Sequence, residues 1–296
     1  MLRTISSLLA LPWALLACSP AAPSMSDASL PDASASVVEP LAGRRVLWIG
    51  AHPDDESTAA PLLALACRDR GAQCTALVAT RGEGGSCAIA SGCAPELGAV
   101  RVREMQRAAS VLGAAVIQWE LSDSSGVTPS AVLAEWAQQT GSEAALRDRM
   151  VRAIDQSDPD VILTFDPRHG TTCHPAHRAI SALVFASLDG VRRRPTVLAI
   201  ESAFAENSAG PTIGVVPVVS SDPRLLAFDA TTPVRAASKS AWGVLLDVLA
   251  AHESQFPPVK LMAFAAAPPA QQRVYLLPGA LVLTAPDAPE FNVCPR

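Results

Sequence analysis

A histidine and three carboxylates stand together at the end of an apolar run near the start of the chain. The apolar run covers residues 46–50, and the polar residues that follow it are His52, Asp54, Asp55 and Glu56. Such a run is typical of a buried strand, and ligands gather at the carboxyl ends of strands in open α/β sheets. An imidazole beside several carboxylates can hold a metal ion and leave one carboxylate free as a base. The segment therefore predicts a metal-dependent hydrolase.

Three more histidines follow a second strand-like run, at residues 161–165. They are His169, His174 and His177. A scattered histidine is more often an ordinary surface or core residue than a ligand. However, parallel strands end at the same edge of a sheet, so the loops after the two runs should converge. This convergence favours a metal site that contains His52 and His177.

The spacing of these residues predicts different roles for neighbouring side chains. His52 and Asp55 lie three positions apart, so one turn can point both inward, with His177 as the third ligand. Two histidines, one carboxylate and an open position for water form a ligand set of catalytic zinc, although another divalent metal would also fit. Asp54 would project to another side and accept a proton from the water. The alternative is that Asp54 only caps the following helix.

Two further residues have predicted roles at the same edge of the sheet. His174 lies three residues before His177, near the metal without necessarily binding it. It would act as an acid or stabilise an oxyanion, and a purely structural role is the alternative. Arg81 follows another strand and is predicted to contact the substrate, with a structural Glu83 beside it. An ordinary surface ion pair is the alternative for this arginine.

Alternating strands and helices must position these side chains. Strands are expected at residues 46–50, 74–80, 115–121 and 161–165, and helices at residues 57–70, 96–112, 143–156 and 175–188. Later strand-like runs at 196–200, 213–219 and 274–277 extend the sheet, and a helix is expected at 236–251. The alternation predicts parallel βαβ units. The expected fold class is α/β, a three-layer sandwich with a Rossmann-like, mostly parallel sheet. Substrate specificity should lie in loops at 81–95, 122–142 and 202–212.

The first 42 residues differ in composition from the rest of the chain. Arg3, an apolar run at residues 5–17 and then Cys18 resemble a bacterial lipoprotein signal at residues 1–17, with lipid attached to the Cys18 thiol. The run is too short for an ordinary membrane span, and an ordinary secretory signal is the alternative. Residues 18–42 are read as a flexible tether and residues 43–296 as one catalytic domain. We therefore expect a lipid-anchored protein of the bacterial cell envelope that faces the periplasm or the exterior.

Cysteine content and charge agree with this location. Beyond Cys18 the chain has six cysteines, an even number that indicates disulfides in an exported protein. Short spacings favour the local pairs Cys67–Cys74 and Cys87–Cys93, with buried free thiols as the alternative. The formal net charge of −5 becomes −6 without residues 1–17, which contain one cation and no acid. A mildly acidic surface argues against nucleic acid as a partner.

Together the motifs resemble the LmbE/PIG-L family of zinc-dependent de-N-acetylases, over roughly residues 44–260. The matching segments are Ala-His-Pro-Asp-Asp-Glu at 51–56, Thr-Arg-Gly-Glu-Gly at 80–84, Glu96 with Arg101 and Glu104, His-Pro-Ala-His at 174–177 and Ala-His-Glu-Ser-Gln at 251–255. The resemblance implies a Rossmann-like fold and hydrolysis of an acetamide, with an N-acetylated sugar or glycoconjugate as the substrate. It also implies that His52, Asp55 and His177 bind zinc and that Asp54 is the base.

The chain departs from the family pattern beside His174. The family usually has His-Pro-Asp-His, whereas Ala176 stands here in place of the aspartate that would support the catalytic histidine. We expect its absence either to lower the pKa of His174 or to transfer its support to another acid such as Asp166. The departure also favours an alternative function, a non-catalytic zinc-containing sugar-binding lipoprotein. A nucleotide-dependent oxidoreductase is disfavoured, because no Gly-x-Gly-x-x-Gly turn follows the first strand.

Overall fold

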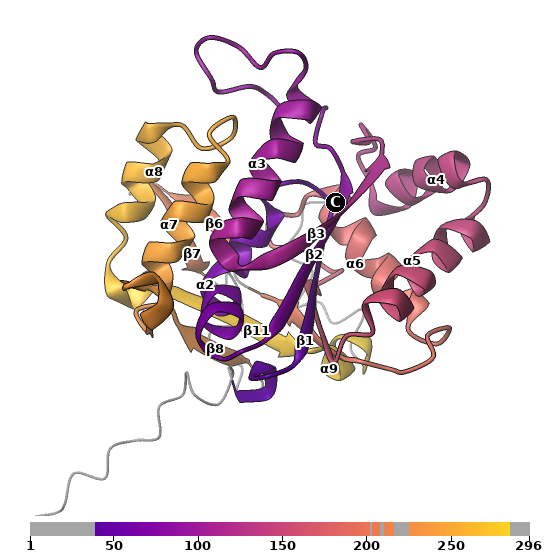
Figure 1. Cartoon of the computed structure of the whole chain (residues 1–296). Coiled ribbons are helices and arrows are strands. Elements are labelled where there is room, and N and C mark those ends of the chain that lie inside the picture. The colour runs from indigo at the N-terminus through magenta and orange to yellow at the C-terminus, as the bar shows by residue number, and fades with distance from the viewer. Residues whose placement is uncertain (1–38, 202, 208–209, 216–224, 285–296) are drawn as a thin grey trace, which may run out of the picture. The chain divides into compact units, whose positions relative to one another are not determined.

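A seven-stranded sheet lies at the centre of the computed structural model, which describes residues 39–201, 203–207, 210–215 and 225–284 (Figure 1). The strands, in spatial order, are β3 (Ala114–Leu121), β2 (Gln73–Thr80), β1 (Arg45–Gly50), β4 (Val161–Phe165), β5 (Thr196–Ile200), β11 (Arg273–Pro278) and β8 (Leu226–Asp229). The first five are parallel, and β11 is antiparallel to both of its neighbours. The predicted α/β class with a mostly parallel, Rossmann-like sheet is therefore confirmed.

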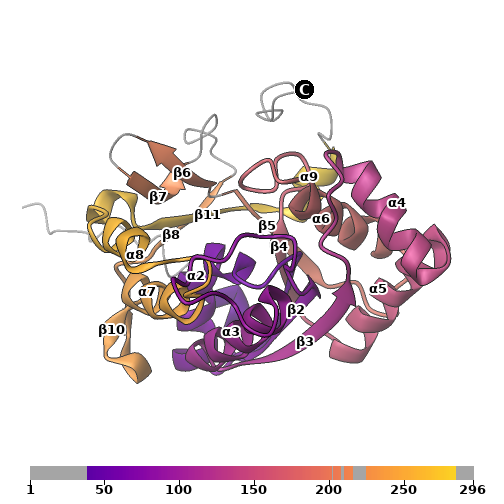
Figure 2. The same ribbon diagram turned by 90° about the horizontal axis from the view of Figure 1, so that it is seen from above.

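Helices cover both faces of this sheet (Figure 2). One layer contains α2 (Ala60–Ala64), α3 (Leu97–Leu112) and α7 (Ala241–Ala251), with α8 (Pro258–Ala265) beside α7, and the other contains α4 (Pro129–Thr140), α5 (Glu143–Ser157) and α6 (Pro175–Ser187). Because both faces are covered, the central strands carry continuous apolar runs, and β4 is buried at every residue. The rings of Trp48 and Phe165 meet edge to face, with centroids 5.3 Å apart, and join β1 to β4.

Local sequence signals account for most helix ends. The side chains of Thr128 and Ser142 accept hydrogen bonds from the first turns of α4 and α5, and Pro175 occupies the first turn of α6. Gly113 ends α3 in the left-handed conformation that glycine adopts without steric cost.

Five expectations about secondary structure were wrong in detail. The run at 213–219 was expected to extend the central sheet, but its described part, residues 213–215, belongs to a separate two-stranded sheet. The helix expected at 57–70 is instead a 3-10 turn (Asp55–Thr58), the short α2 and a π-helical turn (Leu65–Asp69). The helix expected at 236–251 begins only at Ala241, after the Ser240 cap. The segment 122–142 contains α4, and the segment 202–212 contains β6 (Ala203–Asn207) and the start of β7 (Gly210–Val215).

The two predicted local disulfides are present. Cys67–Cys74 ties the π-helical turn to β2, and Cys87–Cys93 closes the loop that follows β2. Cys173 is also disulfide-bonded, and its partner lies outside the described residues. The predicted signal at residues 1–17 and most of the predicted tether likewise lie outside the described part of the chain. No helix of the described residues is long and apolar enough to cross a membrane.

Candidate active site

The loops after β1 and β4 bring the three predicted metal ligands together at the carboxyl edge of the sheet. Asp55 Oδ1 lies 3.0 Å from His177 Nε2 and 3.6 Å from His52 Nδ1. All three residues are buried. A carboxylate oxygen and two imidazole nitrogens therefore point at one another, two from the turn after β1 and one from the first turn of α6, as the sequence predicts.

Backbone hydrogen bonds fix Asp55 in this orientation. Its Oδ2 accepts hydrogen bonds from the backbone N–H groups of Ala51 (2.7 Å) and His52 (2.9 Å). One carboxylate oxygen is thus used to close the turn after β1, and the other remains directed at the two imidazoles. Burial alone would raise the pKa of Asp55. The electrostatic effect of His177 and His52, together with their hydrogen bonds, outweighs burial and holds this pKa well below its usual range.

The outer nitrogens of both imidazoles also have oxygen partners. His177 Nδ1 lies 2.9 Å from the carbonyl oxygen of Gly170, and His52 Nε2 lies 3.1 Å from Asp123 Oδ1. Such partners select the tautomer that directs the other nitrogen to a metal. Gly170 has φ +55°, and a Cβ atom there would lie 2.7 Å from the Cβ of His177. Glycine is therefore required where the backbone approaches this imidazole so closely.

The charge balance of the cluster suits a cation. Burial disfavours a charged imidazole, but the carboxylates of Asp55 and Asp123 outweigh it and raise the pKa of His52 to about 10. Two carboxylates thus favour positive charge beside His52. Histidine nitrogens and a carboxylate oxygen are the ligands that zinc and similar divalent metals take, so the donor set fits such an ion.

Asp54, the predicted base, lies next to the ligands but points to another partner. Its Oδ1 forms an ion pair with Arg101 Nη2 (3.1 Å), and the same nitrogen donates to the carbonyl oxygen of Pro53 (2.5 Å). Asp54 makes no side-chain capping bond, so the capping alternative is not what the structure shows. Burial and the nearby Asp55 raise the pKa of Asp54 against the effect of Arg101, which suits a proton acceptor.

The backbone at Asp54 is held in an unusual conformation. Its φ is +102°, in a region that favours glycine. Its N–H donates to Glu56 Oε2 (3.1 Å), and the other oxygen of Glu56 lies 2.6 Å from His252 Nε2. Glu56 and His252 are fully buried. This buried pair therefore holds the turn that presents Asp54, and Glu56 supports the site without being a ligand.

His174 lies at the cavity but lacks the expected support. Its ring centroid is 4.9 Å from that of His52, and its Nδ1 accepts a hydrogen bond from the N–H of Ala176 (3.3 Å). Within the described residues no carboxylate is hydrogen-bonded to it. Burial and the neighbouring His177 and His52 lower the pKa of His174 to about 4. Two consequences were expected of Ala176, a lowered pKa of His174 or support of His174 by another acid. The structure agrees with the lowered pKa.

Asp166 does not take over the missing role, and that expectation was wrong. Its two carboxylate oxygens share one bifurcated hydrogen bond from Arg168 Nε, each at 2.8 Å. His169 Nε2 lies 2.8 Å from Glu201 Oε2 in the same buried cluster. The polar groups near Asp166 thus form a separate network between the loop 166–174 and Glu201.

The structure places Arg81 away from the site. Arg81 Nη2 lies 2.7 Å from Glu96 Oε1, and Arg81 is not among the residues that line the cavity. This geometry matches the alternative of a surface ion pair, although with Glu96 rather than Glu83. Glu83 is structural: its Oε1 accepts a hydrogen bond from the N–H of Asp123 (3.0 Å).

Two residues without a predicted role occupy the positions nearest the ligands and base. Arg101 is 4% exposed on α3 although it carries a charge, and it contacts Asp54. Asp123 follows β3 and contacts His52. The rule that strand ends converge at one edge would have indicated Asp123, and Arg101 belongs to a motif already noted in the sequence.

A cavity of about 520 Å³ opens above these groups. Its floor is formed by the metal-type cluster and Asp54, and its rim by Gly84, Gly85, Ser86, Ser124, Ser125, Gln255, Phe256 and Lys260. This volume falls in the range of sites that bind a ligand much larger than an acetamide. The structure is thus a Rossmann-like α/β protein whose cavity is lined by side chains of the types that hold a divalent metal.

The sequence of this chain is similar to proteins of one family. The family described as GlcNAc-PI de-N-acetylase (PIG-L) matches residues 47–188. A 1D-myo-inositol 2-acetamido-2-deoxy-α-D-glucopyranoside deacetylase of Nakamurella multipartita is 31% identical over 238 residues, which cover 71% of this chain and 79% of the relative. The chain belongs to the PIG-L (LmbE-like) family.

Another relative of the same name, from Mycolicibacterium vanbaalenii, is 32% identical over 58% of this chain. The matched region spans 65% of that relative, so less than two thirds of its length is shared.

Solved structures confirm the fold. The N,N'-diacetylchitobiose deacetylase from Pyrococcus horikoshii has a TM-score of 0.51 at 18% identity, covering 77% of this chain and 79% of that one. The 4-carboxy-2-hydroxymuconate hydratase from Pseudomonas putida KT2440 has a TM-score of 0.50 at 14% identity, covering 85% of this chain and 97% of that one. Proteins named for different reactions thus share the fold, and the argument for function must come from the site.

Proposed function

We propose that this protein is a zinc-dependent deacetylase that removes the acetyl group from an N-acetylated sugar or glycoconjugate. The observation that carries the proposal is the convergence of Asp55 Oδ1, His177 Nε2 and His52 Nδ1 beside a further carboxylate, Asp54, which is not directed at the histidines but pairs with Arg101. The names of the relatives support the substrate class, since they act on a 2-acetamido sugar.

The three converging side chains would hold the metal. A divalent cation bound there would polarise the acetamide carbonyl and lower the pKa of a water molecule. Asp54 would accept the proton that the attacking water loses, with its carboxylate oriented by the ion pair to Arg101. Asp54 then returns the proton to the nitrogen as the C–N bond breaks, so that acetate and a free amine result.

His174 would act as a neutral hydrogen-bond donor. Its Nδ1 already accepts a hydrogen bond from the N–H of Ala176, which leaves the proton of a neutral ring on Nε2. A pKa of about 4 keeps the ring neutral at pH 7. The Nε2–H group can therefore stabilise the carbonyl oxygen as that oxygen gains negative charge. This role needs no aspartate at position 176.

The direct test is release of acetate from N-acetylglucosamine and from larger N-acetylated glycosides by the purified, zinc-loaded protein. We expect release by the wild type and its loss on chelation, with recovery when zinc is added back. A protein that binds zinc stoichiometrically but releases no acetate from any of these substrates contradicts the proposal.

One observation favours a second candidate function. Because no described carboxylate supports His174, a sugar-binding protein that holds zinc without turnover is the alternative. Calorimetry separates the two: saturable binding of N-acetylglucosamine glycosides that remain intact after prolonged incubation supports the binding protein.

The location is a separate part of the proposal. We propose that the chain is anchored in the cell envelope through a lipid on Cys18, on the grounds of the signal-like sequence of residues 1–18. Its partners would then be an envelope membrane and an N-acetylated glycoconjugate, with no nucleic acid.

A further inference from the structure

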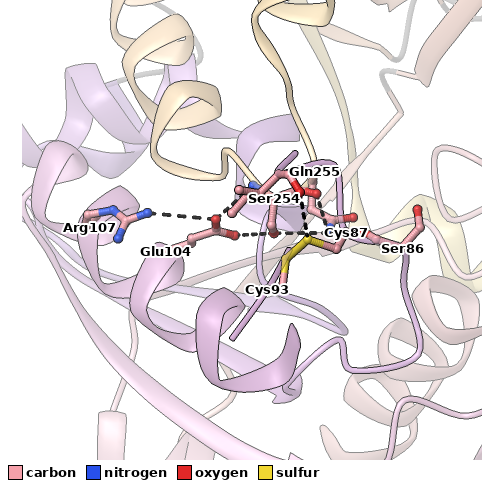
Figure 3. The surroundings of a disulfide bond; sticks show 8 residues. Ser86, Cys87, Cys93, Glu104, Arg107, Ser254 and Gln255 are labelled. Carbon is pink, nitrogen blue, oxygen red and sulfur yellow. Dashed lines mark hydrogen bonds and ion pairs between the residues drawn. A yellow bond between two sulfur atoms is a disulfide. The ribbon is translucent and has the colours of Figure 1, made fainter. Parts of the chain in front are cut away.

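A small disulfide-closed loop lies at the rim of the cavity. The Cys87–Cys93 bond closes it directly after Ser86, which lines the cavity together with Gly84 and Gly85 (Figure 3). Except for Ile89 and Cys93, which are half-buried, the residues from Ser86 to Cys93 are exposed. No part of this loop is packed in the apolar core, so burial contributes little to its order.

The loop is attached to the turn that follows α7. The N–H of Ala88 donates to the carbonyl oxygen of Ser254 (2.8 Å), and Gln255 Nε2 donates to the carbonyl oxygen of Ser86 (2.9 Å). Within the described residues these are the hydrogen bonds that join the segment 86–93 to the rest of the protein. Gln255 itself lines the cavity, so the loop and the turn form one continuous wall.

The buried carboxylate of Glu104 fixes the turn after α7 to α3. The N–H and hydroxyl of Ser254 donate to the two carboxylate oxygens of Glu104, over 2.9 and 2.6 Å. Arg107 lies 3.9 Å from Glu104 and donates a hydrogen bond to the carbonyl oxygen of Ala251 (3.0 Å). Figure 3 shows this series of contacts from α3 to the disulfide. The support of the loop is therefore rigid.

The base of the loop has separate contacts with the active site. Arg101 Nη1 donates to the carbonyl oxygen of Gly82 (2.9 Å), and the N–H of Gly84 donates to Asp123 Oδ2 (3.0 Å). These bonds do not depend on the disulfide. Loss of the disulfide should therefore disorder the rim and leave the residues around Asp54 in place.

We propose that the segment 86–93 and Gln255 form a specificity-determining wall that contacts the part of the substrate beyond the acetylated sugar. The inference rests on the proposed deacetylase function and extends it to the substrate class. Gln255 Nε2 is engaged with Ser86 and Ser254, so the wall offers the Ser86 hydroxyl and the amide oxygen of Gln255, and Phe256 adjoins them in the cavity lining. Hydroxyl and amide groups beside an aromatic ring recognise a further sugar or another polyol.

Paired disulfide variants test the proposal. Cys87→Ser/Cys93→Ser opens the loop, and Cys67→Ser/Cys74→Ser is the matched control, because that disulfide closes a segment of similar length and neither cysteine lines the cavity. The substrates are N-acetylglucosamine and its β-linked disaccharide. We expect the loop variant to raise KM for the disaccharide about tenfold, as loss of one or two hydrogen bonds would, with kcat and the monosaccharide KM nearly unchanged. The control should behave as the wild type with both substrates.

The outcomes separate this inference from the proposed function. Three results would contradict the proposed wall. They are an equal rise in KM for both substrates, no change in either KM, and an equal effect of the control variant. A wild type that releases no acetate contradicts the deacetylase function instead. In that case, the affinities of the zinc-loaded proteins for N-acetylglucosamine and for its β-linked disaccharide, measured by calorimetry, test the wall. A selective tenfold loss for the disaccharide in the loop variant supports it, and unchanged affinities overturn it.

Discussion

At the scale of single residues, the site depends on which atom of each side chain is already engaged. Asp55 uses one oxygen for the backbone and directs the other at the histidines, and each histidine uses one nitrogen on an outer acceptor. The sequence predicts the residue types and their convergence, since both follow from positions at strand ends. It does not predict the outer partners Gly170 and Asp123, because their roles arise only when separate loops pack together.

Replacing the predicted base separates catalysis from metal binding. Asp54→Asn removes the proton acceptor but keeps the shape of the side chain and leaves His52, Asp55 and His177 in place. We expect kcat to fall by a factor of about 10² to 10⁴ while the zinc content stays that of the wild type. Metal analysis and acetate release measure both quantities. A variant that loses its zinc would show that Asp54 is a ligand, and near-normal kcat would remove it from the mechanism.

The buried pair of Glu56 and His252 should affect both stability and catalysis. His252→Ala leaves Glu56 buried without its 2.6 Å partner, and truncating one member of such a pair costs about 3–5 kcal/mol. We expect a loss of this order in the free energy of unfolding, measured in urea. We also expect a lower kcat at temperatures where the variant is folded, because Glu56 holds the N–H of Asp54. Unchanged kcat in the folded variant would limit the pair to a structural role.

At the scale of elements, the apolar runs of the central parallel strands β1 and β4 were predictable from sequence because both faces of such strands are buried. Shorter or interrupted elements were not. The segment that contains α4 begins after a Ser- and Gly-containing stretch, and its helical character depends on the burial of Val132 and Trp136 against neighbouring helices. The expected helix at 57–70 breaks because Asp55–Thr58 forms a tight turn around the site.

The pairing of β1 with β4 should weaken in acid. The carboxylate of Asp160 accepts hydrogen bonds from the backbone N–H of Arg45 (2.9 Å) and from Arg193 Nη1 (2.9 Å). The Arg45 backbone bond, with the Arg45 and Arg193 side chains, lowers the pKa of Asp160 to about 2. Because the folded pKa lies below the unfolded value, this stabilisation is complete above about pH 4 and is lost as the pH falls through 2.

Asp160→Asn should therefore remove a pH-dependent contribution to the free energy of unfolding. We expect the variant to be less stable than the wild type by about 1 kcal/mol at pH 7, after allowance for solvent screening of a partly exposed group. The difference should shrink as the pH is lowered from 4 toward 2. Urea unfolding of both proteins across this range gives the comparison, and a difference that is independent of pH would assign the effect to something other than the charge.

At the scale of the whole molecule, the proposed location depends on residues before the folded domain. Cys18→Ser should abolish lipidation and leave the protein unprocessed or soluble in the periplasm, because the signal-like sequence precedes this cysteine directly. Fractionation of cells grown with a labelled fatty acid tests this. Absence of label in the wild type, together with unchanged membrane association of the variant, would rule out the lipid anchor.

The place of β11 in the sheet has a consequence for how the chain acquires its structure. β11 comes late in sequence but lies between β5 and β8, and it is hydrogen-bonded to both. During synthesis from the N-terminus, β8 therefore emerges well before the strand that attaches it to the sheet. Until residues 273–278 arrive, β5 presents an open edge at which another chain can pair. A chain interrupted before residue 273 would thus be exposed to aggregation, even though every proposed metal ligand had already been made.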